Sequence, residues 1–422
     1  MTRGQALSPP VCPRPPSGPA TMVDRHLNPR PLGFHVMAAT MAWNAAAASL
    51  PAFLGGAPTT HDRLLREADA LRERLRTRTP DIYGQVTDAA IGRIRDMLDG
   101  VSAYHRHPYR RQPSDWPEID TNGSLRILDC GPDLPAGAPT VVIVPSLINP
   151  SYILDLMPTR SLVRHLAAAG LRPLLLDWGE PGAAERLFTL TDYVVERVEP
   201  AIARAAEMAG RPVKLLGYCM GGNLALAATV RHPEPVDRLA LLATPWDFHA
   251  DTAPLGRAVA AMLVRMTETL PVRDTVPVDL LQLFFSSLDP TLVDRKFRRF
   301  GRLDPNSQDA ELFVAIEDWA NDGMPLSRPV AQECLGDWYG DNQPAREQWL
   351  IGGKPIIPQS IRQPVLVVVP HSDRIVPPAS ALALADSIPQ ARQLRAPGGH
   401  VTMLVGPKSR NGLWHPLVSW LQ

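Results

Sequence analysis

The sequence predicts an α/β protein with a mostly parallel, doubly wound sheet, a helical N-terminal region and a helical insertion late in the sheet. Three observations support this prediction. Short apolar runs rich in branched residues alternate with helical stretches from about residue 140 onward. The alternation lapses between Trp246 and Ile361, where the sequence has a helical character. Finally, a chain of 422 residues that is 45% hydrophobic and 20% charged can bury a deep core.

The N-terminal third is predicted to hold a leader and a small helical region. Residues 1–31 are rich in proline and lack the apolar core of a signal peptide, so we interpret them as a disordered leader. Residues 32–115 are expected to be helical. Within them, His35 to Leu54 is mostly apolar, but its small side chains and Pro51 disfavour a membrane span. Two interpretations of this stretch remain open, a core helix and an apolar docking surface. Two helices are expected to follow, at His61–Arg78 and Asp88–Leu98.

Residues 120–422 are predicted to form the sheet domain. Its buried parallel strands are expected at Thr140–Pro145, Pro173–Asp177, Val213–Leu216, Leu239–Ala243 and Pro364–Val369. Helical crossovers are expected at Ser161–Ala169 and Tyr193–Ala209. An insertion at about 247–360 contains the helical stretches Leu255–Leu270 and Asp279–Phe300. We expect this insertion to form a cap over the carboxyl ends of the strands, where ligands bind in open α/β folds.

Charge and cysteine content exclude several classes of protein. Lys plus Arg and Asp plus Glu are both 43, so no global field attracts a polyanion, and we expect no nucleic-acid partner. The four cysteines lie far apart and form no C-x-x-C motif, which argues against a disulfide framework and against a zinc site. A reducing, cytoplasmic location is the natural expectation for such a chain.

A glycine-rich box from Gly217 to Gly222 is the strongest local signal. It reads Gly-Tyr-Cys-Met-Gly-Gly, follows a predicted strand and precedes a predicted helix. This is the context of a nucleophile elbow, the sharp turn of α/β-hydrolase folds, with Cys219 in the place of the usual serine. The glycines allow strand and helix to approach closely, and the helix N-terminus favours the thiolate of Cys219.

The partners of an elbow nucleophile follow in the order acid, then histidine, each in a loop after a strand. Asp373 comes directly after the predicted strand at 364–369, and His400 follows it in a Pro-Gly-Gly-His turn. We therefore predict that Cys219, Asp373 and His400 form a catalytic triad. The alternative for Cys219, a small buried hydrophobic residue, does not account for this surrounding pattern.

At these motifs the chain resembles the polyhydroxyalkanoate synthases, which are α/β-hydrolase-fold acyltransferases with a cysteine nucleophile. The resemblance extends from near Arg126 to the C-terminus. Its motifs are Val144–Asn149, Tyr152–Leu156, Gly217–Gly222, Trp319–Asp322 with Pro325, Asp341–Asn342, Gly352–Gly353, Asp373–Pro377 and Gly399–His400. The chain departs from the family pattern at Ser146, Leu147, Arg374 and Pro378. These departures bear on which nucleophile accepts the acyl group more than on the thiol chemistry itself.

The resemblance implies a 3-hydroxyacyl-coenzyme A substrate, a location on or near polyester granules, and neither a metal nor a redox cofactor. It implies an acyl-cysteine on Cys219, with the backbone N–H groups of Met220 and Leu147 as the oxyanion hole. Substrate contacts are expected from Asn149, Trp246, Trp319, Asp322 and Arg374. The basic cluster Arg295, Lys296, Arg298, Arg299 and Arg302 is either a binding site for coenzyme A phosphates or, as we favour, a solvated helix face.

Two alternatives to a synthase stay open at this point. If water replaces the hydroxyl acceptor, the same residues describe a cysteine-dependent hydrolase acting on acyl-coenzyme A or on a polyester oligomer. A non-enzymatic, granule-associated protein is the third hypothesis, in which His35 to Leu54 mediates attachment. The acyl chain length, a homodimer and the need for a second subunit are not decided by the sequence.

Overall fold

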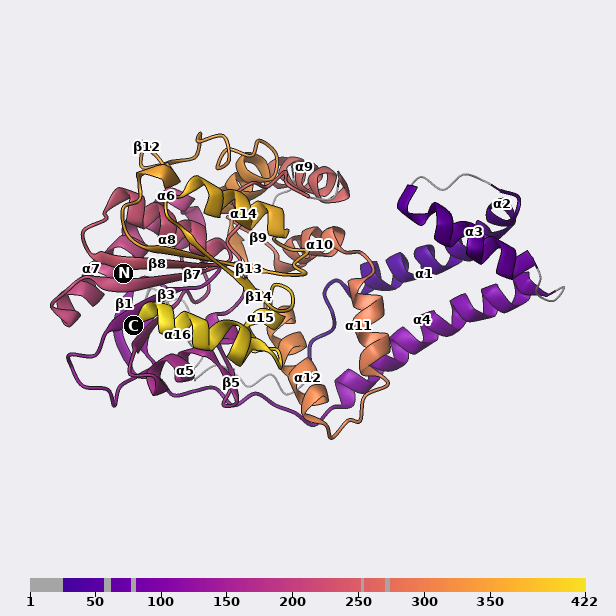
Figure 1. Cartoon of the computed structure of the whole chain (residues 1–422), viewed down its shortest axis with the longest axis horizontal. Helices are drawn as coiled ribbons and strands as arrows, with labels where there is room; N and C mark the ends of the chain where they lie inside the picture. Colours follow the sequence, from indigo (N-terminus) through magenta and orange to yellow (C-terminus); the bar gives the residue numbers. More distant parts are fainter. Residues whose placement is uncertain (1–25, 57–61, 77–80, 252–253, 270–273) are drawn as a thin grey trace, which may run out of the picture.

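A computed structural model describes residues 26–56, 62–76, 81–251, 254–269 and 274–422. Its centre is an eight-stranded sheet in the order β1-β2-β6-β3-β7-β8-β13-β14 (Figure 1). The strands are β1 (Glu118–Asn122), β2 (Leu125–Asp129), β3 (Thr140–Val144), β6 (Arg172–Asp177), β7 (Val213–Tyr218), β8 (Val236–Leu242), β13 (Val365–Pro370) and β14 (Arg392–Ala396). From β6 to β14 all neighbouring pairs are parallel, whereas β2 pairs antiparallel with both β1 and β6. The predicted α/β class and the five predicted strands are confirmed.

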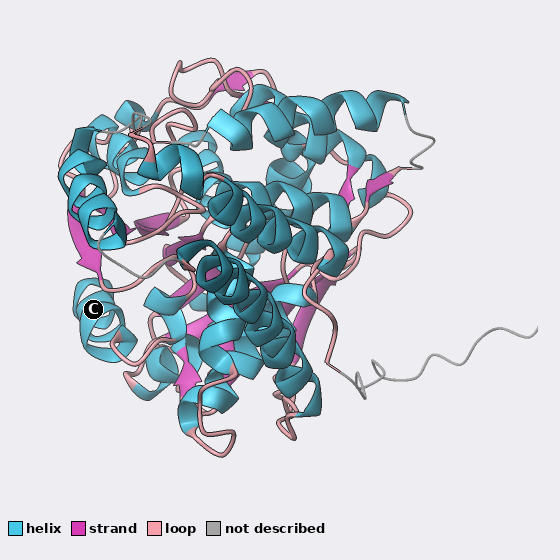
Figure 2. Ribbon diagram, turned by 90° about the vertical axis from the view of Figure 1, so that its right-hand side faces the viewer, coloured by secondary structure: helices cyan, strands magenta, loops and turns pink. Residues whose placement is uncertain are grey.

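The central strands are buried because helices cover both faces of the sheet, as Figure 2 shows. All five residues of β3 are buried, and they alternate between two hydrophobic clusters: Val142 packs on one face and Val141 on the other. One face is covered by α7 (Glu199–Ala209), α8 (Met220–Arg231) and α14 (Pro378–Ser387), and the other by α5 (Leu162–Ala168) and α16 (His415–Leu421). A short π-helix, Val194–Val198, joins α6 (Leu190–Tyr193) to α7.

The connections reverse direction at β3, because the chain passes from β3 to β6 on one side and then to β7 on the other. Such a reversal opens a crevice at the carboxyl ends of the two central strands. The loop after β3 and the turn after β7 meet there, and the turn carries Cys219. The fold therefore places the predicted nucleophile where open α/β sheets bind their ligands.

The cap lies between β8 and β13, as predicted. Its α-helices are α9 (Pro254–Thr269), α10 (Val278–Leu288), α11 (Leu292–Phe300), α12 (Gln308–Asn321) and α13 (Arg328–Gln332). The paired strands β9 (Thr275–Val276) and β10 (Leu326–Ser327) lie among them. The helical stretch predicted at Asp279–Phe300 is divided into two helices, α10 and α11. The chain breaks at Asp289 because Pro290 cannot continue the hydrogen-bonded helix. Leu270, the predicted end of the preceding helix, lies outside the described residues.

Helices α1 (Leu32–Ala48), α2 (Leu50–Leu54), α3 (Asp62–Arg76) and α4 (Ile82–Arg106) form an arm that projects away from the sheet domain (Figure 1). The helix predicted at Asp88–Leu98 corresponds to α4, which extends beyond both of its predicted ends. The arm joins the cap where α4 packs on α11. At Gly100 a Cβ atom would lie 2.0 Å from the carbonyl oxygen of Phe297, so only glycine permits this approach. Helix α3 confirms most of the stretch predicted at His61–Arg78, whose two ends lie outside the described residues.

Residues 26–31, which were predicted to belong to a disordered leader, have a defined place in the structure. Residues 1–25 lie outside the described part of the chain, but residues 26–31 pack against the cap. His26 is buried, and its Nδ1 lies 2.8 Å from an Asp318 carboxylate oxygen on α12, while its Nε2 lies 2.9 Å from the carbonyl oxygen of His107. Within the described residues, no helix is long and apolar enough to cross a bilayer.

Candidate active site

Cys219 lies at the turn between β7 and α8 in a backbone conformation that non-glycine residues rarely adopt. Its φ is 55° and its ψ is −128°. The turn is held by the Cys219 N–H, which donates to the carbonyl oxygen of Leu242 on the neighbouring strand at 2.8 Å. A strained turn of this kind persists only where its surroundings impose it, and it lifts the side chain out of the sheet edge. The geometry is that of a nucleophile elbow, and the thiol is partly exposed.

Three glycines make this turn sterically feasible. A Cβ atom on Gly217 would lie 2.4 Å from the Cα of Gly222, and one on Gly221 would lie 2.1 Å from the carbonyl oxygen of Val144. On Gly222 it would lie 1.9 Å from the hydroxyl oxygen of Thr244. The glycine-rich box is therefore required by the close packing of β7, α8 and the end of β3.

Asp373 and His400 meet above this turn. Asp373 follows β13, and its Oδ1 accepts the backbone N–H groups of Ile375 and Val376 at 2.8 and 2.9 Å. Its other carboxylate oxygen, Oδ2, lies 2.7 Å from Nδ1 of His400. Since a carboxylate only accepts, Nδ1 carries the proton. This leaves Nε2 of His400 without a proton in the neutral ring, so it can accept one from Cys219, which lines the same cavity.

The charges around His400 stabilise its protonated form. Burial by itself lowers the pKa of the imidazole, but the negative charge and the hydrogen bond of Asp373, with a contribution from Cys219 nearby, raise it well above its usual value. The Tyr218 hydroxyl also donates to the carbonyl oxygen of His400 at 3.3 Å, which helps to fix the loop. The arrangement can hold a proton between a thiol and an imidazole that a carboxylate orients.

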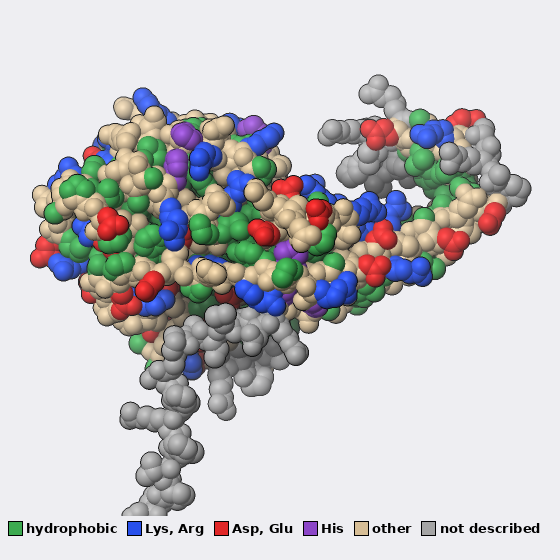
Figure 3. All heavy atoms as spheres, turned by 90° about the horizontal axis from the view of Figure 1, so that it is seen from below, with side chains coloured by type: hydrophobic (Ala, Val, Ile, Leu, Met, Phe, Trp, Pro, Cys, Tyr) green, Lys and Arg blue, Asp and Glu red, His purple; other side chains and the backbone are tan. Residues whose placement is uncertain are grey.

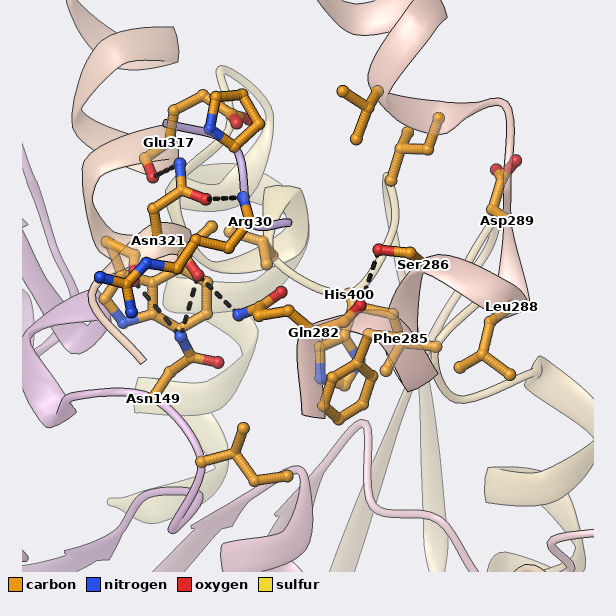
Figure 4. Close-up of a pocket in the computed structure, with 18 of the residues that line it drawn as sticks. Arg30, Asn149, Gln282, Phe285, Ser286, Leu288, Asp289, Glu317, Asn321 and His400 are labelled. Carbon is orange, nitrogen blue, oxygen red and sulfur yellow. Dashed lines mark hydrogen bonds between the residues drawn. The ribbon is translucent and has the colours of Figure 1, made fainter. Parts of the chain in front are cut away.

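Cys219 and His400 border a cavity of about 260 Å³ between the sheet and the cap, and Figure 4 shows His400 beside it. Its walls come from the loops after β3, β7, β13 and β14 and from α10, α11 and α12. Its lining is mostly apolar. Among the predicted substrate residues, Asn149, Trp319 and Arg374 line it. Asn149 Nδ2 donates to the carbonyl oxygens of Trp319 and Ala320 at 3.3 and 3.4 Å, which ties the loop after β3 to the cap.

Two of the predicted substrate residues lie elsewhere. Trp246 is buried, packs edge-on against Trp349 in the core, and is not part of the cavity wall. Asp322 accepts a hydrogen bond of 3.0 Å from the Tyr152 hydroxyl and borders a separate cavity. Burial raises the pKa of Asp322. Neither side chain reaches the cavity that contains Cys219, because the position of a residue along the chain does not reveal which way its side chain faces.

The predicted oxyanion hole concerns the backbone at Met220 and Leu147. Both side chains are buried. Gly221 brings the start of α8 against the carbonyl oxygens of Val144 and Pro145, so the loop after β3 runs directly beside the elbow. Their use as an oxyanion hole stays a prediction.

The basic cluster on α11 is largely neutralised. Arg295 pairs with Asp289 at 2.7 Å, Lys296 with Glu317 at 2.6 Å, Arg298 with Asp294 at 3.0 Å and Arg302 with Asp96 at 3.0 Å. Phe297 and Phe300 between them are buried against the arm. The favoured interpretation of a helix face with aromatic anchors fits these contacts better than a phosphate site does.

The residues that sequence reasoning missed come from the N-terminal segment. Pro29, Arg30 and His35 line the cavity, more than 180 positions before Cys219. No local pattern marks them, because their approach depends on how the arm packs on the cap. The segment around His35 therefore contributes to the wall of this cavity, and removing it up to Leu54 would open the candidate active site.

The alpha/beta hydrolase fold family matches residues 139–407, and the chain belongs to this family. The resemblance seen in the motifs is also confirmed. The chain is similar to poly(3-hydroxyalkanoate) polymerase subunits PhaC of Haloferax mediterranei (29% identity, 66% of this chain and 58% of the relative), Haloarcula marismortui (30%, 66% and 60%) and Allochromatium vinosum (29%, 68% and 83%). It thus spans about three fifths of the length of the two haloarchaeal relatives.

Proposed function

We propose that the protein is an acyltransferase of the polyhydroxyalkanoate synthase type. It would form an acyl-cysteine on Cys219 from a 3-hydroxyacyl-coenzyme A and pass the acyl group to a hydroxyl. The observation that carries the proposal is the placement of Cys219 and His400 on the wall of one mostly apolar cavity, with His400 hydrogen-bonded to Asp373. The polymerase relatives support the same chemistry.

The proton and bond changes follow from this geometry. Nε2 of His400 takes the thiol proton of Cys219, and the thiolate attacks the thioester carbonyl. The resulting oxyanion would be met by the N–H groups of Met220 and Leu147. When the carbon–sulfur bond to coenzyme A breaks, the leaving thiolate recovers the proton from His400. A hydroxyl then gives its proton to His400 and attacks the acyl-cysteine, which forms an ester and restores the thiol of Cys219.

Incubation of the protein with 3-hydroxybutyryl-coenzyme A tests this proposal and its alternative. We expect release of free coenzyme A thiol together with a product that sediments and yields crotonic acid on acid treatment, as a polyester does. Thiol release accompanied only by soluble 3-hydroxybutyrate would instead identify a hydrolase, in which water is the acceptor. No thiol release would reject both, and would leave the non-enzymatic hypothesis.

We further propose that the arm attaches the protein to the surface of a polyester granule in the cytoplasm. Figure 3 shows hydrophobic side chains between charged ones along the arm. Large apolar side chains exposed there are Met37, Met41, Leu71, Tyr83, Ile91 and Leu98. Met37 and Met41 lie one turn apart on the same face of α1, with 52% and 65% of their surface exposed. An apolar face of this kind can dock on an apolar polymer surface.

Replacing both methionines by glutamine should weaken adsorption to polyester particles by about tenfold, because two half-exposed apolar side chains lose their burial on the polymer. The measurement is the fraction of protein that sediments with poly(3-hydroxybutyrate) particles. Turnover of soluble substrate should not change. Met262→Gln, an exposed methionine on α9 in the cap, is the matched control. Equal adsorption of the double variant and the wild type would contradict docking through α1.

A further inference from the structure

The N-terminal segment before and at the start of α1 forms part of the wall of the candidate active site. Pro29, Arg30 and His35 line the cavity that also contains Cys219 and His400. This segment lies outside residues 139–407, which the hydrolase family matches. Residues from outside the matched hydrolase domain therefore complete the wall of its candidate catalytic cavity.

The backbone of Arg30 is fixed on both sides. Its N–H donates to Oδ1 of Asn321 on α12 at 3.2 Å, and its carbonyl oxygen accepts from Nε2 of His35 at 3.0 Å. Burial, together with the nearby charge of Lys296, lowers the pKa of His35, so its ring stays neutral and Nε2 keeps the proton that it donates. Four residues earlier, His26 anchors the chain to Asp318. The position of Arg30 is therefore preorganised.

The side chain of Arg30, in contrast, has much of its hydrogen-bonding capacity free. In the described part of the chain its nearest carboxylate is that of Asp279, 3.9 Å from Nε, and that carboxylate is itself 63% exposed. The Arg30 side chain is 36% exposed and lines the cavity, so it lies where the cavity meets solvent. Figure 4 shows it beside Asn149 and Asn321.

The other cations of the cavity are more tightly paired. Lys296 lies 2.6 Å from the buried carboxylate of Glu317. Arg374 lies 3.6 Å from Asp289, which also pairs with Arg295. An incoming anion would have to compete with a short contact at Lys296 and with a shared one at Arg374. At Arg30 it would displace only a long contact to an exposed carboxylate.

We propose that Arg30 is a specificity residue that binds a phosphate group of coenzyme A at the mouth of the cavity. This inference rests on the proposed function. The acyl thioester must reach Cys219 inside the cavity, whereas phosphates are strongly hydrated and remain at its mouth. A guanidinium offers five N–H donors in a planar fork that matches phosphate oxygens. Arg30 thus distinguishes a coenzyme A thioester from a thioester without phosphates.

The test compares two substrates that share the same thioester. Wild type, Arg30→Met and Arg30→Lys are assayed with 3-hydroxybutyryl-coenzyme A and with 3-hydroxybutyryl-N-acetylcysteamine, which has no phosphate. For Arg30→Met we expect KM for the coenzyme A thioester to rise at least about tenfold, from the loss of a charge-assisted contact, with kcat little changed. KM for the phosphate-free thioester should stay the same, and Arg30→Lys should recover part of the loss.

Arg299→Met is the matched control, because Arg299 is exposed on α11, belonged to the basic cluster, and does not line the cavity. It should change neither KM value. An equal rise of KM on both substrates in Arg30→Met would overturn the inference and show that Arg30 only shapes the cavity.

Calorimetric titration with coenzyme A alone separates this inference from the proposed function, because it needs no turnover. We expect the Kd of coenzyme A to rise at least about tenfold in Arg30→Met. An unchanged Kd, or a wild type that does not bind coenzyme A, rejects the inference even if turnover is found. Binding that depends on Arg30 without any turnover would reject the proposed function and leave the phosphate contact in place.

Discussion

Cys219→Ala should lose at least about 10⁴-fold in kcat/KM for 3-hydroxybutyryl-coenzyme A, because no other thiol in the described part of the chain is placed to form the acyl-enzyme. Among the described cysteines, Cys130 and Cys334 are buried. Burial raises the pKa of both thiols, so neither offers a reactive thiolate. Alanine removes only the sulfur at a turn whose conformation the neighbouring glycines already permit, so the fold should survive.

Cys130→Ala is the matched control, since it also removes one sulfur but at a site away from the cavity. It should keep the turnover of the wild type. Mass spectrometry after brief exposure to substrate should find one acyl group on the wild type, none on Cys219→Ala, and one on Cys130→Ala. Circular dichroism checks that each variant is folded. Turnover by a folded Cys219→Ala would mean that the acyl group is carried elsewhere or that water attacks directly.

The sheet and the elbow could be predicted because their signals are local. Apolar runs such as 140–144 identify strands that are buried on both faces. The glycine box identifies the turn because Gly221 and Gly222 have no space for a Cβ atom. The meeting of Asp373 with His400 was also predictable, since both follow strands whose carboxyl ends share one edge of the sheet.

Features that depend on long-range packing could not be predicted in this way. The edge strand at 392–396 is mostly polar and exposed, so it has no apolar run to announce it. The entry of Arg30 into the cavity depends on contacts such as that of His26 with Asp318, which are 292 positions apart. Trp246 and Asp322 were both predicted to contact the substrate, but their side chains face the core and a second cavity. The order of elements along the chain is enough to predict the path of the backbone in the sheet, whereas the direction of each side chain depends on tertiary packing.

Asp373→Asn should lower kcat by about 10⁴-fold, because the substitution reverses the hydrogen bond that selects the tautomer of His400. Oδ1 of Asp373 accepts two backbone N–H groups, from Ile375 and Val376, and only an oxygen can fill that place. The new amide must therefore turn its NH₂ group toward Nδ1 of His400, where Asp373 Oδ2 now lies at 2.7 Å. Nδ1 then accepts, the proton moves to Nε2, and Nε2 can no longer take the proton of Cys219.

The same substitution has an effect on titration that a purely structural loss would not have. The charge of Asp373 raises the pKa of His400 against the opposing effect of burial, so removing that charge should make the imidazolium lose its proton at a lower pH than in the wild type. A ¹⁵N-histidine NMR titration reports both the tautomer and the pKa. Asp386→Asn, an exposed carboxylate on α14, should alter neither. An unchanged His400 titration in Asp373→Asn would show that the carboxylate does not govern this imidazole, whatever the loss of turnover.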